Sequence, residues 1–198
     1  MYMKNIFFLC LLAYFLFDFS SMSFSSAAFR RCRKLLESAG IEVGEPVVDV
    51  DPKNAAYDAC SLRLGGKPCC YRTAKITPTK NGAFVTCWKR PGGKGPIVPF
   101  TPEDLHALLV AVEEGSKFGF FVFPAKDLLK QKILSKESGG EKGKLSFRVY
   151  APWVATESKQ AAATQTWQNP FFVESGKRGC ESILQETFTE SRKRPGVE

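Results

Sequence analysis

The 198-residue sequence contains a single histidine, His106. Zinc sites built from several histidines are therefore excluded, and a Ser-His-Asp triad would depend on this one residue. No Gly-x-Ser-x-Gly motif accompanies it. Because it stands in Leu105-His106-Ala107-Leu108, we interpret His106 as a packing or surface residue of a predicted helix.

The sequence also lacks a Cys-x-x-Cys pair, although it has seven cysteines. This absence argues against a zinc finger and against a thioredoxin-like redox site. Cys69 and Cys70 are adjacent, so in a strand their side chains would point to opposite faces of the sheet. We expect buried free thiols rather than disulfides, as is typical of a reducing compartment.

The apolar run at residues 6–17 is twelve residues long, too short for a membrane-spanning helix, which needs about 20 residues. With Lys4 before it and Ser26-Ala27-Ala28 after it, the run is typical of a secretory signal peptide. The competing interpretation is that translation begins at Met22, which would then start a functional domain. The protein would be secretory or organellar in the first case and cytoplasmic in the second.

Acidic residues are outnumbered, with 20 Asp and Glu against 28 Lys and Arg, and the formal net charge is +8. Lys4 and Asp18 cancel within residues 1–22, so the whole excess lies in the rest of the chain. A basic balance favours nucleic acid, an anionic ligand or an acidic surface as the partner, and it says nothing about the fold.

Short apolar segments separated by turn residues fill most of the sequence. Capping residues and apolar stripes at helical spacing predict helices at residues 29–39, 101–114, 125–133 and 158–168. Residues rich in β-branched and aromatic side chains predict strands at 57–64, 69–76, 83–89, 118–123 and 145–150. The first three strands would form an antiparallel meander, and the continuous apolar run at 118–123 indicates a strand buried on both faces.

These elements predict an α+β (mixed α/β) domain with one mixed, mainly antiparallel sheet and flanking helices. The domain would span residues 29–174, after an apolar leader at residues 1–28. Residues 175–198 are dense in charge and lack a sustained apolar period, which predicts a disordered and dispensable tail.

Residues 71–90 carry the most informative pattern, a predicted hairpin connected through Pro78 and the turn-forming pair Asn81-Gly82. Five cations lie in, beside or directly after it: Arg72, Lys75, Lys80, Lys89 and Arg90. A solvated sheet face would have a similar composition. The density of cations favours a surface for an anion, above all a phosphate backbone.

The same stretch and three later blocks resemble the MepB-like family. The matching residues are Arg72-Thr73-Ala74-Lys75-Ile76-Thr77-Pro78-Thr79-Lys80 with Gly82, Phe84-Val85 and Trp88-Lys89-Arg90, then Phe121-Val122-Phe123-Pro124, then Phe147-Arg148-Val149-Tyr150 with Pro152-Trp153, then Lys159-Gln160-Ala161 with Thr164-Gln165 and Trp167-Gln168. Their order and spacing match the family from about Asn54 to Glu174. The resemblance implies a restriction-endonuclease-like fold and a DNA-binding domain, with or without cleavage.

Charge and resemblance together select the candidate nucleic-acid-binding residues, which are Arg72, Lys75, Lys80, Lys89, Arg90, Arg148, Lys159, Gln160, Gln165, Trp167 and Gln168. The cations would neutralise phosphates, and the tryptophan would stack on an unpaired base or pack in the core. The glutamines would hydrogen-bond base edges or cover a helix face. The predicted partner is nucleic acid, in the first place duplex DNA, with no cofactor and no stable membrane span in the mature domain.

Cleavage would require at least two carboxylates that hold Mg²⁺, with a lysine beside them. Cys87 stands where the Asp/Glu-x-Lys signature would place an acid before Lys89. Asp51-Pro52-Lys53 and Glu157-Ser158-Lys159 fit the triplet, but a charged chain produces such triplets by chance.

Asp58 and Glu45 could still reach a metal. Because the signature acid before Lys89 is missing, we nevertheless predict binding without catalytic or metal residues. A Mg²⁺-dependent nuclease and a module for anionic small molecules or peptides remain the alternatives.

Overall fold

The computed structural model describes residues 26–136, 142–176 and 181–189. Within these residues the helices are α2 (Ala27–Ser38), α3 (Pro52–Ala55), α4 (Ala125–Lys130), α5 (Lys159–Gln168) and α6 (Glu181–Phe188), with short 3-10 turns at Pro91–Gly93 and Asn169–Phe171. No helix in this part of the chain has the length and apolar character needed to cross a bilayer.

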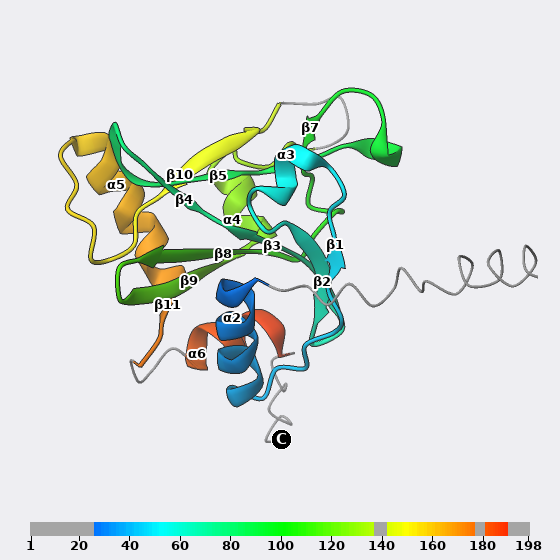
Figure 1. Cartoon of the computed structure of the whole chain (residues 1–198), viewed down its shortest axis with the longest axis horizontal. Coiled ribbons are helices and arrows are strands. Elements are labelled where there is room, and N and C mark those ends of the chain that lie inside the picture. The colour runs from blue at the N-terminus through cyan, green and yellow to red at the C-terminus, as the bar shows by residue number, and fades with distance from the viewer. Residues whose placement is uncertain (1–25, 137–141, 177–180, 190–198) are drawn as a thin grey trace, which may run out of the picture.

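The described strands are β1 (Val47–Val48), β2 (Cys60–Leu64), β3 (Lys67–Thr73), β4 (Lys75–Thr77), β5 (Lys80–Thr86), β6 (Trp88–Lys89), β7 (Val98–Pro99), β8 (Ala107–Glu114), β9 (Lys117–Pro124), β10 (Ser146–Val149) and β11 (Phe172–Glu174). The main sheet has six strands in the order β1-β2-β3-β8-β9-β11 (Figure 1). Only the β3–β8 pair in it is parallel. The predicted α+β class, with a mixed and mainly antiparallel sheet and flanking helices, is confirmed.

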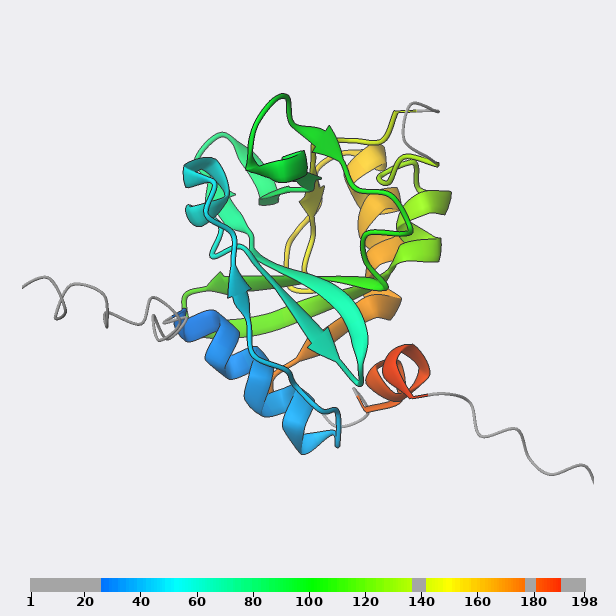
Figure 2. The same ribbon diagram turned by 90° about the vertical axis from the view of Figure 1, so that its right-hand side faces the viewer.

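The main sheet is buried on both faces. On β8, Leu109 joins the core under α2 and α6, whereas Leu108 and Val110 join the core under the second sheet, α4 and α5. Figure 2 shows α2 and α6 on one side of the sheet and α4 and α5 on the other. The prediction that residues 118–123 form a strand buried on both faces is confirmed, since Phe120 and Phe121 enter opposite cores.

The predicted meander is correct for its first two strands and wrong for the third. β2 and β3 pair antiparallel, with Cys60 opposite Tyr71, but β3 ends at Thr73. After Ala74, whose backbone N–H bonds to Ala111 O, the chain leaves the main sheet. β4 and β5 then pair with each other and with β10 in a separate three-stranded sheet, while β6 and β7 form a two-stranded one.

The connection between β4 and β5 is Pro78-Thr79, because Thr77 pairs directly with Lys80. The prediction of an Asn81-Gly82 turn is therefore wrong, and both residues lie in β5 at a shift of register. Gly82 has φ +78°, and a Cβ there would lie 2.7 Å from the Tyr150 ring. Glycine is needed at this position for the bulge and for close packing rather than for a turn.

The predicted helix at residues 101–114 is wrong, because residues 107–114 form strand β8. The Thr101 backbone N–H and hydroxyl donate to the Asp104 carboxylate at 2.7 and 3.1 Å, so the expected cap closes a turn instead of opening a helix. An apolar run buried on all sides has no period that separates a strand from a helix. His106 accordingly precedes a strand, and its Nε2 lies 2.8 Å from Thr187 O.

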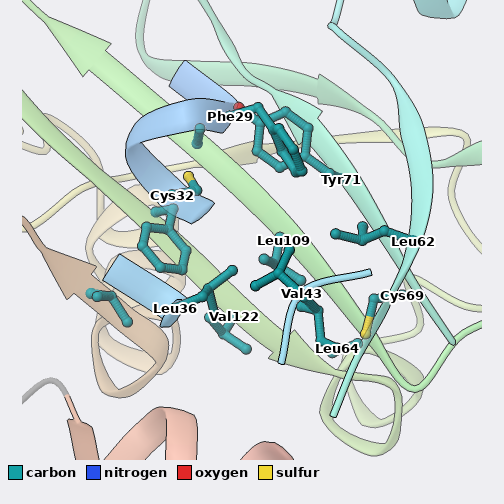
Figure 3. Packing of buried hydrophobic residues seen from close by; sticks show 14 of the residues in the cluster. Phe29, Cys32, Leu36, Val43, Leu62, Leu64, Cys69, Tyr71, Leu109 and Val122 are labelled. Carbon is teal, nitrogen blue, oxygen red and sulfur yellow. The ribbon is translucent and has the colours of Figure 1, made fainter. Parts of the chain in front are cut away.

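The first predicted helix is confirmed as α2, which begins two residues earlier than expected. Ser26 Oγ accepts from the Phe29 backbone N–H at 3.3 Å, and Gly40, with φ +76°, follows its C-terminal end. Phe29, Cys32 and Leu36 point from α2 onto the strands of the main sheet (Figure 3). Residues 1–25, which carry the apolar run and Met22, lie outside the described residues, whereas Ala27 and Ala28, the last residues of the predicted leader, lie in α2.

The predicted tail at residues 175–198 contains a packed helix, so the prediction of disorder is wrong for α6. Leu184 and Phe188 are 1% and 3% exposed and belong to the core under α2. Two apolar residues four positions apart were too few to outweigh the charges around them in the sequence. Residues 177–180 and 190–198 of that segment lie outside the described residues.

The expected free thiols are confirmed for five cysteines, all of them buried: Cys32, Cys60, Cys69, Cys70 and Cys87. Cys69 and Cys70 enter opposite cores, as strand alternation requires. Burial raises the pKa of Cys60, Cys69 and Cys87 to about 12 and that of Cys70 to about 11. These thiols are therefore protonated and weakly nucleophilic at neutral pH.

Candidate nucleic-acid interface

A hollow of about 550 Å³ lies between β10, the start of β5 and α5, and we call it the basic groove. Three cations line it, Lys80, Lys144 and Arg148. Gln160, Trp167 and Gln168 line it as well, so five of the eleven predicted site residues meet there. No described carboxylate lines the groove.

Arg148 holds the turn between β4 and β5 together. Its Nη1 donates to the carbonyls of Lys80, Asn81 and Gly82 at 3.0–3.4 Å, and its Nη2 donates to Thr77 Oγ1 at 2.8 Å. The guanidinium satisfies carbonyls that the bulge at Asn81-Gly82 leaves out of the ladder. Arg148 thereby fixes the backbone that carries Lys80, a positioning role that the sequence did not predict.

Two predicted base-reading glutamines bond to the backbone instead. Gln168 is 0% exposed, its Oε1 accepts from Tyr150 N at 2.8 Å, and its Nε2 donates to Arg148 O at 2.9 Å. Gln165 Nε2 donates to Ala151 O and Val154 O at 2.9 and 2.8 Å. Both side chains tie α5 to the end of β10, so the Gln168 amide and the Nε2 group of Gln165 are engaged within the chain.

The remaining predicted residues of α5 lie at or near the surface. Lys159 and Gln160 are exposed in its first turn, where the Ser158 side chain caps the helix by accepting from Ala161 N at 3.1 Å. Trp167 is half-buried and packs 5.4 Å, centroid to centroid, from the Phe123 ring. Its partly exposed indole lines the basic groove.

A second hollow, of about 410 Å³, was missed by the sequence reasoning, and we call it the lysine hollow. Five lysines line it, Lys126, Lys130, Lys132, Lys136 and Lys142, together with Leu129 and Leu134. The two hollows flank the same segment, residues 131–134. The signal was present as six lysines between residues 126 and 144, but they were divided between a predicted helix and a predicted loop.

The other predicted cations lie away from both hollows and mostly pair with acids. Lys89 Nζ bonds to Asp104 Oδ1, and Arg90 Nε donates to Asp51 Oδ2 at 2.7 Å. This hydrogen bond from Arg90 lowers the pKa of Asp51. The guanidinium of Arg72, which is buried, lies 3.5 Å from Asp49, and Lys75, which is exposed, has its Nζ 5.0 Å from the Tyr57 ring centroid.

A family model described as MepB-like matches residues 51–174, which is more than half of the chain. The chain belongs to the MepB-like family. A solved structure of MepB is 29% identical with a TM-score of 0.61, and the match covers 89% of this chain and 100% of MepB. The resemblance of residues 54–174 is thereby confirmed.

A bacterial homing endonuclease of known structure also matches, at 13% identity and a TM-score of 0.40, over 71% of this chain and 85% of the endonuclease. This similarity is too low to indicate a shared function. A comparison with curated proteins found no significant match.

Asp49 and Asp51 of the MepB-like chain are hydrogen-bonded within the chain. Asp49 accepts from Asp51 N and from Asn54 Nδ2, and Asp51 accepts from Lys53 N and from Arg90 Nε. Each of the four carboxylate oxygens thus accepts one N–H of the chain.

The other acidic candidates are engaged as well. Asp58 Oδ2 accepts from the hydroxyls of Ser26 and Thr73 at 2.9 Å, and Glu45 pairs with Arg33. Across residues 26–136, 142–176 and 181–189, no three His, Cys, Asp or Glu side chains are placed to share a metal.

Proposed function

We propose that this MepB-like protein binds nucleic acid, in the first place duplex DNA, through the basic groove and the lysine hollow, and that it does so without cutting. The observation that supports the proposal most strongly is the distribution of charge. Three cations line one hollow and five line the other, and no carboxylate of the described chain lines either.

Such a surface suits a polyanion. Each lysine that neutralises a phosphate releases a condensed counterion, which supplies much of the affinity for duplex DNA. Lys80 and Lys144 are exposed, and neither forms an ion pair among the described residues. Lys159, in the first turn of α5 at the positive end of the helix dipole, adds positive potential beside the groove.

The nuclease alternative has weaker support. Asp51, in the triplet Asp51-Pro52-Lys53, caps α3 and forms an ion pair with Arg90. Glu157 accepts from Asn81 Nδ2 at 2.8 Å, beside the bulge that Arg148 holds. Each of these carboxylates thus already has a hydrogen-bond partner within the chain.

The double variant Lys80→Ala/Lys144→Ala should bind a 20-base-pair duplex about 25-fold more weakly than the unmodified protein. We expect about 1 kcal/mol for each lost contact, which is about fivefold in Kd. Fluorescence anisotropy at fixed salt measures this. The matched control is Lys75→Ala/Lys117→Ala, which removes the same charge from exposed lysines outside both hollows and should leave Kd nearly unchanged.

Equal weakening by both double variants would show that net charge alone attracts the DNA, and it would contradict an interface at the groove. Unfolding curves of all three chains should agree within about 0.5 kcal/mol, because exposed side chains contribute little to stability. A parallel incubation of supercoiled plasmid with MgCl₂ tests the nuclease alternative, and nicking that EDTA abolishes would support it over binding alone.

A further inference from the structure

A third hollow, of about 600 Å³, shares no lining residue with the basic groove or the lysine hollow, and we call it the Arg72 cavity. It lies between β1, α3, the strand pair β2–β3 and the segment at residues 89–100. Its charged lining consists of Asp49, Asp51, Lys53, Arg72, Lys89 and Arg90. The four cations exceed the two acids, so the wall is positive overall. A cavity of this size suits a small organic ligand.

Arg72 is a buried cation whose hydrogen bonding is incomplete. Its side chain is 2% exposed, and its Nη1 donates to Tyr71 O at 2.8 Å. Its Nη2 lies 3.5 Å from Asp49 Oδ2, a distance at which the pair is electrostatic rather than a good hydrogen bond. Its Nε has no hydrogen-bond partner among the described residues. Because Nε is enclosed by the protein, the guanidinium acts on the cavity through its positive charge, which the chain's own hydrogen bonds only partly satisfy.

The charged neighbours of Arg72 are held in place before any ligand arrives. Asp104 holds Lys89, and Asp51 together with the carbonyl of Gly95 holds Arg90. Because these side chains are already ordered, an anion that meets them pays little additional conformational entropy. The Phe100 ring lies 5.8 Å from the Arg72 guanidinium carbon and forms an apolar wall beside the charge.

The mouth of the cavity is unusually apolar. Val47, Val48 and Val50 line it and are 68%, 42% and 88% exposed. They are three of the five large apolar residues that are exposed in the described chain, and they cluster within four positions. Exposed apolar groups beside a buried, under-bonded cation suit a ligand with an anionic head and an apolar body.

We propose that the Arg72 cavity binds a small organic anion, an aryl or alkyl carboxylate or phosphate monoester. The anionic head would lie in the positive field of Arg72, beside the other cations of the lining, Lys53, Lys89 and Arg90. The apolar body would lie against Phe100 and the valines of residues 47–50. This site is independent of the nucleic-acid interface, because the two surfaces have no lining residue in common.

Isothermal titration calorimetry of the full chain tests the proposal with phenyl phosphate and benzoate as probes, with inorganic phosphate and benzyl alcohol for comparison. At least one aromatic anion should bind at millimolar or lower concentration, and inorganic phosphate and benzyl alcohol should each bind at least about tenfold more weakly. The anion that binds more tightly identifies the head group as phosphate or carboxylate.

Two variants locate the site. Val48→Trp should fill the cavity mouth and weaken the better probe at least about tenfold. Lys53→Glu, which reverses an exposed lining charge, should weaken it about fivefold. The matched controls are Ile76→Trp and Lys75→Glu, which make the same changes at exposed positions outside the cavity and should leave binding unchanged.

Three results would overturn the proposal: no binding of either aromatic anion, equal binding of benzyl alcohol, or unchanged binding in both Val48→Trp and Lys53→Glu. Inorganic phosphate that binds as tightly as phenyl phosphate would overturn the apolar half of the site. The Lys80→Ala/Lys144→Ala variant should bind the probe normally, so that failure here and failure of the nucleic-acid proposal are distinguished.

Discussion

Alanine at Leu184 or at Phe188 should lower the free energy of unfolding by about 2–5 kcal/mol for leucine and about 3–5 kcal/mol for phenylalanine. Both side chains lie in the core between α6, α2 and the main sheet. Truncation removes buried methylenes and leaves a cavity that the surrounding strands fill only in part. A domain with an ordinary stability of about 5–15 kcal/mol would lose a large part of it from either change.

Polar contacts join α6 to the same sheet and make the helix part of the domain. Thr187 O lies 2.8 Å from His106 Nε2, and it also accepts from Lys67 Nζ at 3.4 Å. Urea unfolding measures the two variants against Glu186→Ala, an exposed position on the same helix that should shift the midpoint little. Midpoints that agree for all three variants would mean that α6 does not pack on the body.

The Gln168→Leu variant should be destabilised by about 2–6 kcal/mol, although leucine fills nearly the same volume. The change leaves the Tyr150 N–H and the Arg148 carbonyl without their partner, and each buried unpaired group costs about 1–3 kcal/mol. Gln160→Leu is the matched control, because Gln160 is exposed on the same helix.

Urea unfolding and DNA-binding measurements on both variants distinguish a structural role of Gln168 from a role in reading a base edge. A structural role predicts a large loss of stability and unchanged DNA affinity in the fraction that remains folded. If Gln168 reads a base edge, stability should change little while discrimination between DNA sequences falls, and that outcome would contradict the contacts described above.

The local sequence pattern predicted secondary structure correctly where capping residues or apolar periodicity were clear. The helix α2 follows from its serine cap and apolar stripe, and the run at residues 118–123 follows from its unbroken apolarity. Residues 107–114 show where such patterns fail. This apolar run is a strand because it pairs with β3 and β9. More than thirty residues separate β3 from β8, so local sequence cannot reveal that pairing.

The candidate site was predictable in charge but not in position. Lys80 was expected at a phosphate-binding surface and lines the basic groove, while the acids that engage Lys89 and Arg90 lie 15 and 39 residues away in the sequence. Lys144, which lies just before β10, lines the basic groove together with Lys80 because β10 pairs with β5 and brings the chain back. The local spacing of residues in the sequence does not predict such long-range strand pairing.

The dependence of DNA affinity on salt tests the nucleic-acid interface most directly. Log K should fall linearly with log salt for the unmodified chain, and the slope should flatten by about one unit for each of Lys80→Ala and Lys144→Ala. The Lys75→Ala and Lys117→Ala variants should keep the full slope. Identical slopes for all five chains, at unchanged stability, would contradict phosphate contacts at the basic groove.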